Sequence, residues 1–401
     1  MRRLAVALAT VALLSGCQTA KDFLGIGTYQ KPLPGQRVSV LQLSSSQTAD
    51  PALADVKVLL PQPFANPEWP QPGGYASHAM YHLELAGSLH VVWKASIGSG
   101  ADSNLKILSE PVVGGGRVYA IDAESQVSAF NADSGARLWR TDVAGDVDSD
   151  KLLGGGVAYD SGRVFVVSID NNLVALAEDD GRRLWSHNGL NETAGLLGTA
   201  APAVAENEVV VVYSSGEIYG LRADTGRTLW SDTLAGQIRG GAVATLADIR
   251  GRPVIDRDAA IAISNSGTIA ALDLKTGTRI WDSNFGGSQA PWVAGDYIYV
   301  LTTDQQLLCL TRQDGKVRWV SQLPKYADPA NPTEPILWHG PVLASNRLIL
   351  TSTNSTALAV SPYTGKFLGE IALPSPTHLP PVVAKGTLFI LSDNADLIAL
   401  R

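Results

Sequence analysis

Short apolar runs alternate with polar turns along most of the chain, and residues 111–139 show the pattern most clearly. Two runs there, 117–122 and 126–131, are rich in the β-branched and aromatic residues that favour strands. The Asp-Ser-Gly triplet at 133–135 is typical of a tight turn. No run is long enough, or periodic enough at about 3.6 residues, to predict a helix. We therefore predict four short strands here, the last of which begins at Trp139.

The same unit recurs, and its mark is a Gly followed four positions later by a Trp. The pairs are Gly135–Trp139, Gly181–Trp185, Gly226–Trp230, Gly277–Trp281 and Gly315–Trp319. The intervals between the tryptophans are 46, 45, 51 and 38 residues. A period of about 45 residues with four short strands per unit is typical of a β-propeller. The Trp offers a large rigid surface, which we expect to pack between neighbouring blades.

Two counts of the units agree on an all-β ring of seven four-stranded antiparallel blades. The outer-strand positions are Trp93, Trp139, Trp185, Trp230, Trp281, Trp319 and a degenerate Gly369 that has lost its Trp. The expected inner strands begin near Pro111, Gly154, Pro202, Pro253, Pro291, Pro341 and Pro381. The last unit lacks an outer strand, and the strand at Trp93 lacks partners before it. We therefore expect these two pieces to complete one blade, which removes free sheet edges.

Residues 1–16 are expected to be a signal peptide. Two arginines precede an apolar run, 4–14, that is too short to span a bilayer. The tetrapeptide Leu14-Ser15-Gly16-Cys17 resembles a bacterial lipobox, which implies lipidation of Cys17 and cleavage before it. The alternative is an ordinary secretory signal with an incidental cysteine. Gln18, in place of Asp, resembles an outer-membrane sorting address, so we expect a lipid-anchored protein on the periplasmic face of that membrane.

Composition changes after the signal. Eight of the 22 prolines lie between Pro32 and Pro72, which predicts an extended tether over residues 17–75 and a propeller over residues 76–401. Removal of residues 1–16 leaves 29 basic and 38 acidic residues, a net charge of −9. This acidic balance, without a basic stripe, argues against nucleic acid as a partner.

Candidate residues for catalysis are few. His78 and His82 have the spacing of a metal pair, but no Glu follows His78 and no helical pattern surrounds them. The acidic residues at 146, 148 and 150 resemble the start of a calcium loop, yet Lys151 stands where that loop needs Gly. Cys309 lies within an apolar strand and is expected to be buried and inert. We therefore expect no catalytic residue, no metal and no cofactor.

The repeat, of the form VxALxxxTGxxxW, resembles that of quinoprotein dehydrogenases, which bind pyrroloquinoline quinone. That resemblance implies adjacent cysteines over the quinone, calcium ligands and a catalytic Asp. The sequence contains no adjacent cysteine pair. The resemblance therefore extends to the fold and not to the chemistry.

A closer resemblance covers nearly the whole chain. The lipobox, tether, repeat and closing strand are similar to the family of outer-membrane protein assembly factor BamB. Four segments resemble its alphaproteobacterial branch: NPEWPQPGGYASHAM, LNETAGLLGTAAPAV, LADIRGRPVIDR and SPYTGKFLGEIALP. The family ring usually has eight blades, so eight is the alternative to the count of seven. The resemblance implies a non-enzymatic scaffold that binds the periplasmic POTRA domains of the barrel-inserting subunit BamA.

The resemblance also implies contact residues in two loops. The family's apolar loop, which ends in Leu-Arg-Gly, falls at Leu196, Leu197 and Gly198, where Leu197 replaces the Arg. Its acidic Asp-x-Asp loop falls at Asp248 and Arg250, where Arg250 replaces the second Asp. Nascent outer-membrane proteins are a further expected partner. The alternatives are a periplasmic propeller that binds another envelope protein or the cell wall and, more remotely, a quinone-dependent dehydrogenase.

Overall fold

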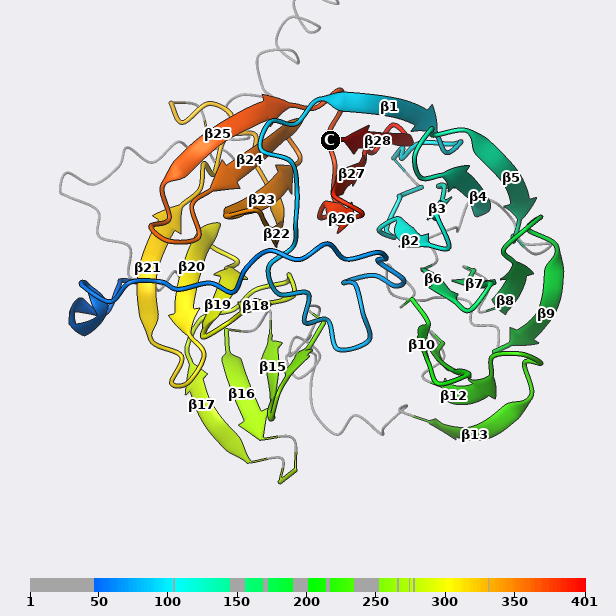
Figure 1. Ribbon diagram of the computed structural model, residues 1–401, viewed down its shortest axis with the longest axis horizontal. Coiled ribbons are helices and arrows are strands. Elements are labelled where there is room, and N and C mark those ends of the chain that lie inside the picture. Colours follow the sequence, from blue (N-terminus) through cyan, green and yellow to red (C-terminus); the bar gives the residue numbers. More distant parts are fainter. Residues whose placement is uncertain are drawn as a thin grey trace, which may run out of the picture. The chain divides into compact units, whose positions relative to one another are not determined.

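The computed structural model describes residues 47–103, 105–144, 156–168, 172–189, 201–213, 217–233, 252–264, 267–273, 275–276, 278–330 and 332–401. These residues form seven four-stranded antiparallel sheets, the blades of a β-propeller (Figure 1). The predicted all-β class and the count of seven are confirmed for this part of the chain. In each blade the first strand lies near the centre of the ring and the fourth at the rim (Figure 1).

The first three blades follow one another in sequence. Blade 1 contains β2 (Val112–Gly114), β3 (Arg117–Ile121), β4 (Gln126–Asn131) and β5 (Arg137–Asp142). Blade 2 contains β6 (Val157–Asp160), β7 (Arg163–Val167), β8 (Asn172–Ala177) and β9 (Arg183–Asn188). Blade 3 contains β10 (Ala203–Ala205), β11 (Glu208–Val212), β12 (Glu217–Arg222) and β13 (Thr228–Thr233).

The remaining blades bring the sequence back to its first strand. Blade 4 contains β14 (Val254–Asp256), β15 (Ala259–Ile263), β16 (Ile269–Asp273) and β17 (Arg279–Ser283). Blade 5 contains β18 (Trp292–Ala294), β19 (Tyr297–Leu301), β20 (Gln306–Thr311) and β21 (Val317–Gln322). Blade 6 contains β22 (Trp338–Ala344), β23 (Arg347–Ser352), β24 (Thr356–Val360) and β25 (Phe367–Ala372). Blade 7 contains β26 (Val382–Ala384), β27 (Thr387–Leu391), β28 (Asp396–Leu400) and β1 (Val91–Ser96); a single 3-10 turn, η1 (Pro51–Leu53), precedes them all.

The turn before each outer strand explains why the repeat needs its polar residues and its Gly. In blade 1 the Asn131 side chain accepts hydrogen bonds from the N–H groups of Asp133 and Ser134, at 3.0 and 2.9 Å. Gly135 then adopts a φ of +71° and its N–H donates to the Asn131 carbonyl at 2.9 Å. A left-handed backbone strains residues with a Cβ, so Gly suits this position.

The tryptophan of one blade packs on that glycine in the next blade, as predicted. A Cβ placed on Gly135 would lie 2.6 Å from the Trp93 ring. The indole Nε1–H donates to the carbonyl three residues before the glycine, at 2.7–3.1 Å. The docked pairs are Trp93–Gly135, Trp139–Gly181, Trp185–Gly226, Trp281–Gly315 and Trp319–Gly365. Each docked indole therefore joins two blades through packing and one hydrogen bond.

The ring closes by pairing between strands far apart in sequence. Strand β1 pairs antiparallel with β28, in a register that places Trp93 opposite Ala399 and Ser96 opposite Asp396. The predicted closure of the C-terminal unit by the Trp93 strand is confirmed. Lys94 adds an ion pair with Asp396 at 2.8 Å.

Residues 64–85, which we call the strap, run across the centre of the ring (Figure 1). The strap makes hydrogen bonds with the first strand of six blades. The pairs are Trp69 with Val113, Pro70 with Tyr159, Ser77 with Ile255, Tyr81 with Trp292, Leu83 with Leu343, and Asn66 with Val383. Its carbonyl and N–H groups thus find partners inside the ring, as buried backbone requires.

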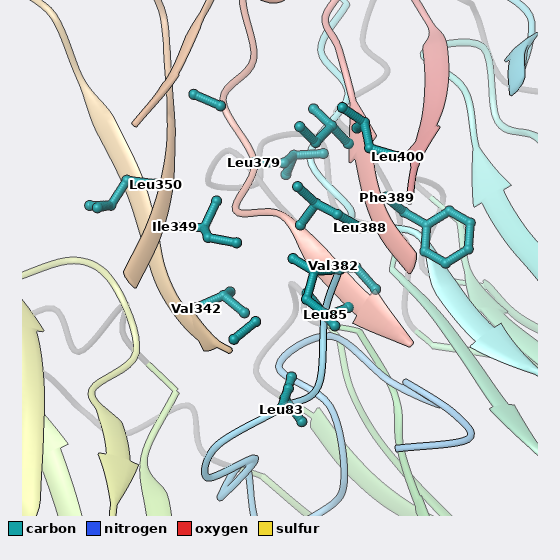
Figure 2. Close-up of a cluster of buried hydrophobic side chains, with 14 of the residues drawn as sticks. Leu83, Leu85, Val342, Ile349, Leu350, Leu379, Val382, Leu388, Phe389 and Leu400 are labelled. Atoms are coloured by element: carbon teal, nitrogen blue, oxygen red, sulfur yellow. The ribbon is translucent and has the colours of Figure 1, made fainter. Parts of the chain in front are cut away.

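The strap also supplies apolar side chains to the core. Trp69, Met80 and Leu83 are each at most 2% exposed. Leu83 and Leu85 lie beside Val342 of blade 6 and Val382 of blade 7 (Figure 2). The compact unit that contains the propeller also includes the described residues 47–75 of the Pro-rich region.

Candidate partner-binding site

All of the predicted site residues fall outside the described residues: Cys17, Leu196, Leu197, Gly198, Asp248 and Arg250. The strands that flank them are described. Residues 196–198 belong to the connection from β9 to β10, and residues 248–250 to the connection from β13 to β14. The two connections therefore flank the same sheet, blade 3.

Sheet topology relates the ends of the flanking strands. Each blade is antiparallel in the order first to fourth strand, so its strands alternate in direction. Every connection from an outer strand to the next inner strand therefore starts and ends on the same face of the ring. The strand ends that flank both predicted contact segments lie on this face, which we call the connection face.

An aromatic cluster supports the strand that precedes the first segment. His187 of β9 stacks on Tyr213 at 5.9 Å between ring centroids, and its ring nitrogen Nδ1 lies 2.8 Å from the Tyr213 hydroxyl. That hydroxyl donates to the His187 carbonyl at 2.9 Å. Tyr219 of β12 packs at 4.6 Å from His187. A Cβ on Gly189 would lie 2.5 Å from the Tyr213 ring, so the backbone passes close to this cluster.

Trp230 lies on β13, before the second segment, and it departs from the repeat. Its side chain is 42% exposed, whereas Trp93, Trp139, Trp281 and Trp319 are at most 8% exposed. Its Nε1–H donates to the Glu208 carboxylate of its own blade at 2.6 Å. The indole lies over Gly220, where a Cβ would be 2.1 Å from the ring. Blade 3 thus presents a partly exposed indole on its outer strand.

A buried carboxylate holds the strand that follows the second segment. Arg252 pairs with Glu110 at 2.7 Å, and Glu110 is 3% exposed. The other Glu110 oxygen accepts the Gly73 N–H at 3.0 Å, which ties the strap to this pair. A buried charge of this kind is costly unless it is paired and hydrogen-bonded, so the arrangement fixes blade 4 relative to blade 1.

The two candidate metal histidines each bond a backbone carbonyl. His78 Nδ1 lies 2.8 Å from the Pro253 carbonyl, and His82 Nδ1 lies 2.6 Å from that of Pro61. The Asn346 N–H donates to the other His82 nitrogen at 2.9 Å. Burial lowers the pKa of both imidazoles. Within the described ranges no group of three or more His, Cys, Asp or Glu residues could hold a metal ion.

Cys309 is fully buried on β20, and burial raises the pKa of its thiol well above the usual range. A thiol held neutral in this way is a poor nucleophile. The predicted burial of Cys309 is therefore confirmed. The predicted acidic loop at 146–150 lies outside the described residues.

Sequence reasoning missed the exposure of Trp230, although the sequence contains a signal for it. The residue opposite the tryptophan on the third strand is Ala129, Ala175, Ala271, Cys309 or Ala399 in the other blades that have a tryptophan, and Gly220 in blade 3. The missing side chain leaves room for the indole to lie over its own sheet.

Fold and repeat together define the class of protein: a β-propeller whose blades are joined by docked tryptophans. Among solved structures, this chain is similar to the quinohemoprotein alcohol dehydrogenase of Comamonas testosteroni. The TM-score is 0.51 and identity 15%, and the match covers 80% of this chain and 76% of that one. BamB from Moraxella catarrhalis matches with a TM-score of 0.49 and 15% identity, over 78% of this chain and 100% of that one. At 15% identity, the match to the Comamonas enzyme shows a similar fold only.

The sequence identifies the family. The sequence model described as "Outer membrane protein assembly factor BamB" matches residues 87–321, more than half of the chain. The protein belongs to this family.

Curated relatives agree with this assignment. Outer membrane protein assembly factor BamB of Salmonella typhimurium is 24% identical over 51% of this chain and 50% of its own length. The Escherichia coli protein is 25% identical over the same shares of both chains. The chain therefore spans about half the length of the curated relatives it matches. Within the part that the structure describes, no helix is long and apolar enough to cross a membrane.

Proposed function

We propose that this protein is a non-enzymatic scaffold lipoprotein of the outer-membrane β-barrel assembly machinery. In this proposal it binds the periplasmic POTRA domains of a BamA-like barrel-inserting subunit and assists insertion of outer-membrane proteins. The observation that carries the proposal is the family match over residues 87–321, which includes both predicted contact segments. Nascent outer-membrane proteins are a second proposed partner, and the sequence segments quoted above favour an alphaproteobacterial origin.

The proposed contact lies on the connection face, on either side of blade 3. Leu196, Leu197 and Gly198 supply an apolar contact, and an apolar pair in a loop is stabilised when a partner covers it. Asp248 and Arg250 supply charges that orient the partner and speed the encounter more than they tighten it. Trp230 falls between the two segments in the sequence and has an exposed indole, and Trp is a residue type enriched at energetically dominant contacts.

The position of the strap favours a scaffold function rather than an enzymatic one. A ring of blades offers a small molecule its central channel, and here residues 64–85 cross that region with buried side chains. The quinone of the related dehydrogenases requires calcium ligands and an adjacent cysteine pair. The described residues offer no cluster for a metal, and the sequence has no such cysteine pair. These residues do not fit pyrroloquinoline quinone.

The proposed contact can be tested by copurification from solubilised envelopes. Leu196→Asp together with Leu197→Asp should abolish recovery of the barrel-inserting subunit while circular dichroism stays native. Asp248→Arg should weaken recovery several-fold, and more at low salt because its effect is electrostatic. Leu138→Asp is the matched control, since Leu138 is an exposed leucine, 46% accessible, on the outer strand of blade 1.

Full recovery of the barrel-inserting subunit by the folded double mutant would show that the apolar loop is not the contact. Recovery of a different envelope protein, or of peptidoglycan, by the wild type alone would favour the alternative partner class. Absorbance of bound quinone after addition of pyrroloquinoline quinone would favour the dehydrogenase alternative.

The anchor is tested separately. Cys17→Ala should yield an uncleaved or soluble periplasmic protein, because the thiol that accepts the lipid is gone. The wild type should sediment with outer membranes on a density gradient. Its appearance in the inner-membrane fraction would contradict the outer-membrane address that Gln18 suggests.

A further inference from the structure

Four of the docked tryptophans pack on an aromatic ring from the second strand of their own blade. The ring centroids in these pairs lie 5.8–5.9 Å apart. The pairs are Trp93–Phe389, Trp139–Tyr119, Trp185–Phe165 and Trp319–Tyr299. An aromatic pair is therefore the usual filling of a junction between blades in this ring.

The junction between blades 6 and 7, which we call the seam, lacks both members of the pair. Gly369 lies opposite Ala359, as Trp319 lies opposite Cys309, so a glycine occupies the tryptophan position. Ile349 occupies the position of the second-strand aromatic residue, opposite Val342. A Cβ on Gly369 would meet no atom within 4 Å. The space that an indole fills elsewhere is open here.

A cavity of about 340 Å³ lies at this place. Its apolar lining combines three sources: Ile349, Leu358 and Leu368 from blade 6, Leu388 from blade 7, and Leu89 from the segment that precedes β1. Ile349 and Leu388 come from the two blades that flank the seam (Figure 2). An apolar cavity of about 150 Å³ can hold a benzene ring, so this one has room for an indole.

The rim of the cavity is apolar and exposed. Leu368 and Ile371 of β25, which line the cavity, are 55% and 36% exposed. A free aromatic molecule in the cavity would leave this rim exposed to solvent. A peptide that carries the aromatic ring would also cover part of the rim. Such a patch beside a pocket is typical of a protein-binding surface.

Arg347 supplies a polar group at the same cavity. Its Nη groups donate to the carbonyls of Ala86 and Gly87, and the Gly87 bond is 2.7 Å long. Its buried Nε–H has no acceptor among the described residues. Arg347 thus ties the segment before β1 to blade 6 beside the cavity.

We propose that the seam is a second binding site, which takes an aromatic side chain, foremost tryptophan, presented by a peptide segment of a partner protein. The repeat itself indicates the occupant, because an indole from the preceding blade fills the equivalent space at five other junctions. The site lies between blades 6 and 7, apart from the segments that flank blade 3, and does not depend on the function proposed above.

The probe is 5-fluoro-N-acetyltryptophanamide, a tryptophan with peptide groups on both sides, observed by fluorine NMR in the presence of the full chain. Wild-type protein should give saturable line broadening with a submillimolar dissociation constant. Gly369→Trp fills the cavity from within, so the affinity should fall at least ten-fold while the melting temperature rises. Gly369→Leu, a smaller filling, should also reduce binding if the tryptophan variant does not fold.

Leu138→Trp is the matched control. It adds an indole on the outer strand of blade 1, where the junction is already filled, and should leave the affinity unchanged.

Two results would overturn the proposal. The first is binding of the amide probe that persists unchanged in folded Gly369→Trp and Gly369→Leu, since the probe would then occupy another place. The second is binding of 5-fluoroindole without binding of the amide probe, since the cavity would then exclude a ring attached to a peptide chain.

Discussion

Neighbouring blades are held together differently at the docked junctions and at the seam. At a docked junction an indole from one blade packs on a left-handed glycine of the next blade and donates to its backbone. At the seam that indole is missing, and Leu83 and Leu85 of the strap pack beside Val342 of blade 6 and Val382 of blade 7. Blade 7 itself is completed by main-chain pairing between β1 and β28, which are far apart in the sequence. The repeat motif therefore holds neighbouring blades, whereas distant segments complete the ring.

Removal of residues 388–401 should have the largest effect on this comparison. The deletion removes β28 and most of β27, so β1 loses its partner and the ring is open. We expect loss of the cooperative unfolding transition in calorimetry and in urea titration, because exposed sheet edges replace a closed ring. A truncated protein with the wild-type melting curve would show that the ring does not need this closure.

Substitution of a docked indole should cost less than the deletion but more than a surface change. Trp319 is 5% exposed, so Trp319→Ala should lower the free energy of unfolding by about 3–5 kcal/mol. Trp230 is 42% exposed, and Trp230→Ala should cost about 1 kcal/mol or less. Urea denaturation of both variants checks the difference, and equal losses would contradict the distinction between the two tryptophans.

The seam should also be the acid-sensitive junction. His339 of β22 lies 5.9 Å from His378, and burial, with a smaller effect of His378, lowers the pKa of His339 to about 4. Its unfolded value is about 6.5, so the unfolded state binds the extra proton. The stability it contributes is therefore complete above pH 6.5 and is lost as the pH falls towards 4. The loss should reach on the order of 3 kcal/mol by pH 4.

His378 acts in the opposite direction. Its hydrogen bond to Asp393, at 2.8 Å, raises its pKa, so its contribution is complete below the unfolded pKa and lost as the pH rises through the folded one. The His378 side chain is 51% exposed, so solvent screening keeps its contribution to the free energy of unfolding small. Unfolding free energies of His339→Gln measured from pH 7 to 4 should decline less than those of the wild type. His90→Gln, at an exposed histidine, is the control, and an unchanged slope in His339→Gln would exclude His339 as the source.

A difference between two glycine variants separates the packing role of the repeat glycine from its backbone role. Gly315 has a φ of +66° and a Cβ there would lie 2.4 Å from the Trp281 ring. Gly386 has a φ of +64° but open space around it. Gly386→Ala should cost about 1–2 kcal/mol from backbone strain alone. Gly315→Ala should cost about 1–3 kcal/mol more through overpacking, and equal thermal shifts would argue against docking as the reason for the glycine.

The ring could be predicted from the sequence because its determinants are local. Short β-rich runs, turn residues and the Gly-to-Trp spacing recur along the chain. The strands and turns of one unit can therefore be predicted from the residues of that unit. Seven blades, the degenerate position at Gly369 and the role of Trp93 in closure all followed from this pattern and are met in the structure. The predicted contact residues came from family resemblance, and no local pattern determines them.

Tertiary structure determined the burial of the strap, the exposure of Trp230 and the cavity at the seam. The strap has no periodic apolar pattern, and its Pro-rich composition predicted an extended segment. It is buried because six separate blades supply partners for its backbone and its Trp69 side chain fits among them. Trp230 carries the same motif as Trp139, yet it is exposed because its surroundings differ. The cavity at the seam likewise exists only where blades 6 and 7 and the segment before β1 meet. A motif thus determines the strand and turn it encodes, whereas burial depends on neighbours that are distant in the sequence.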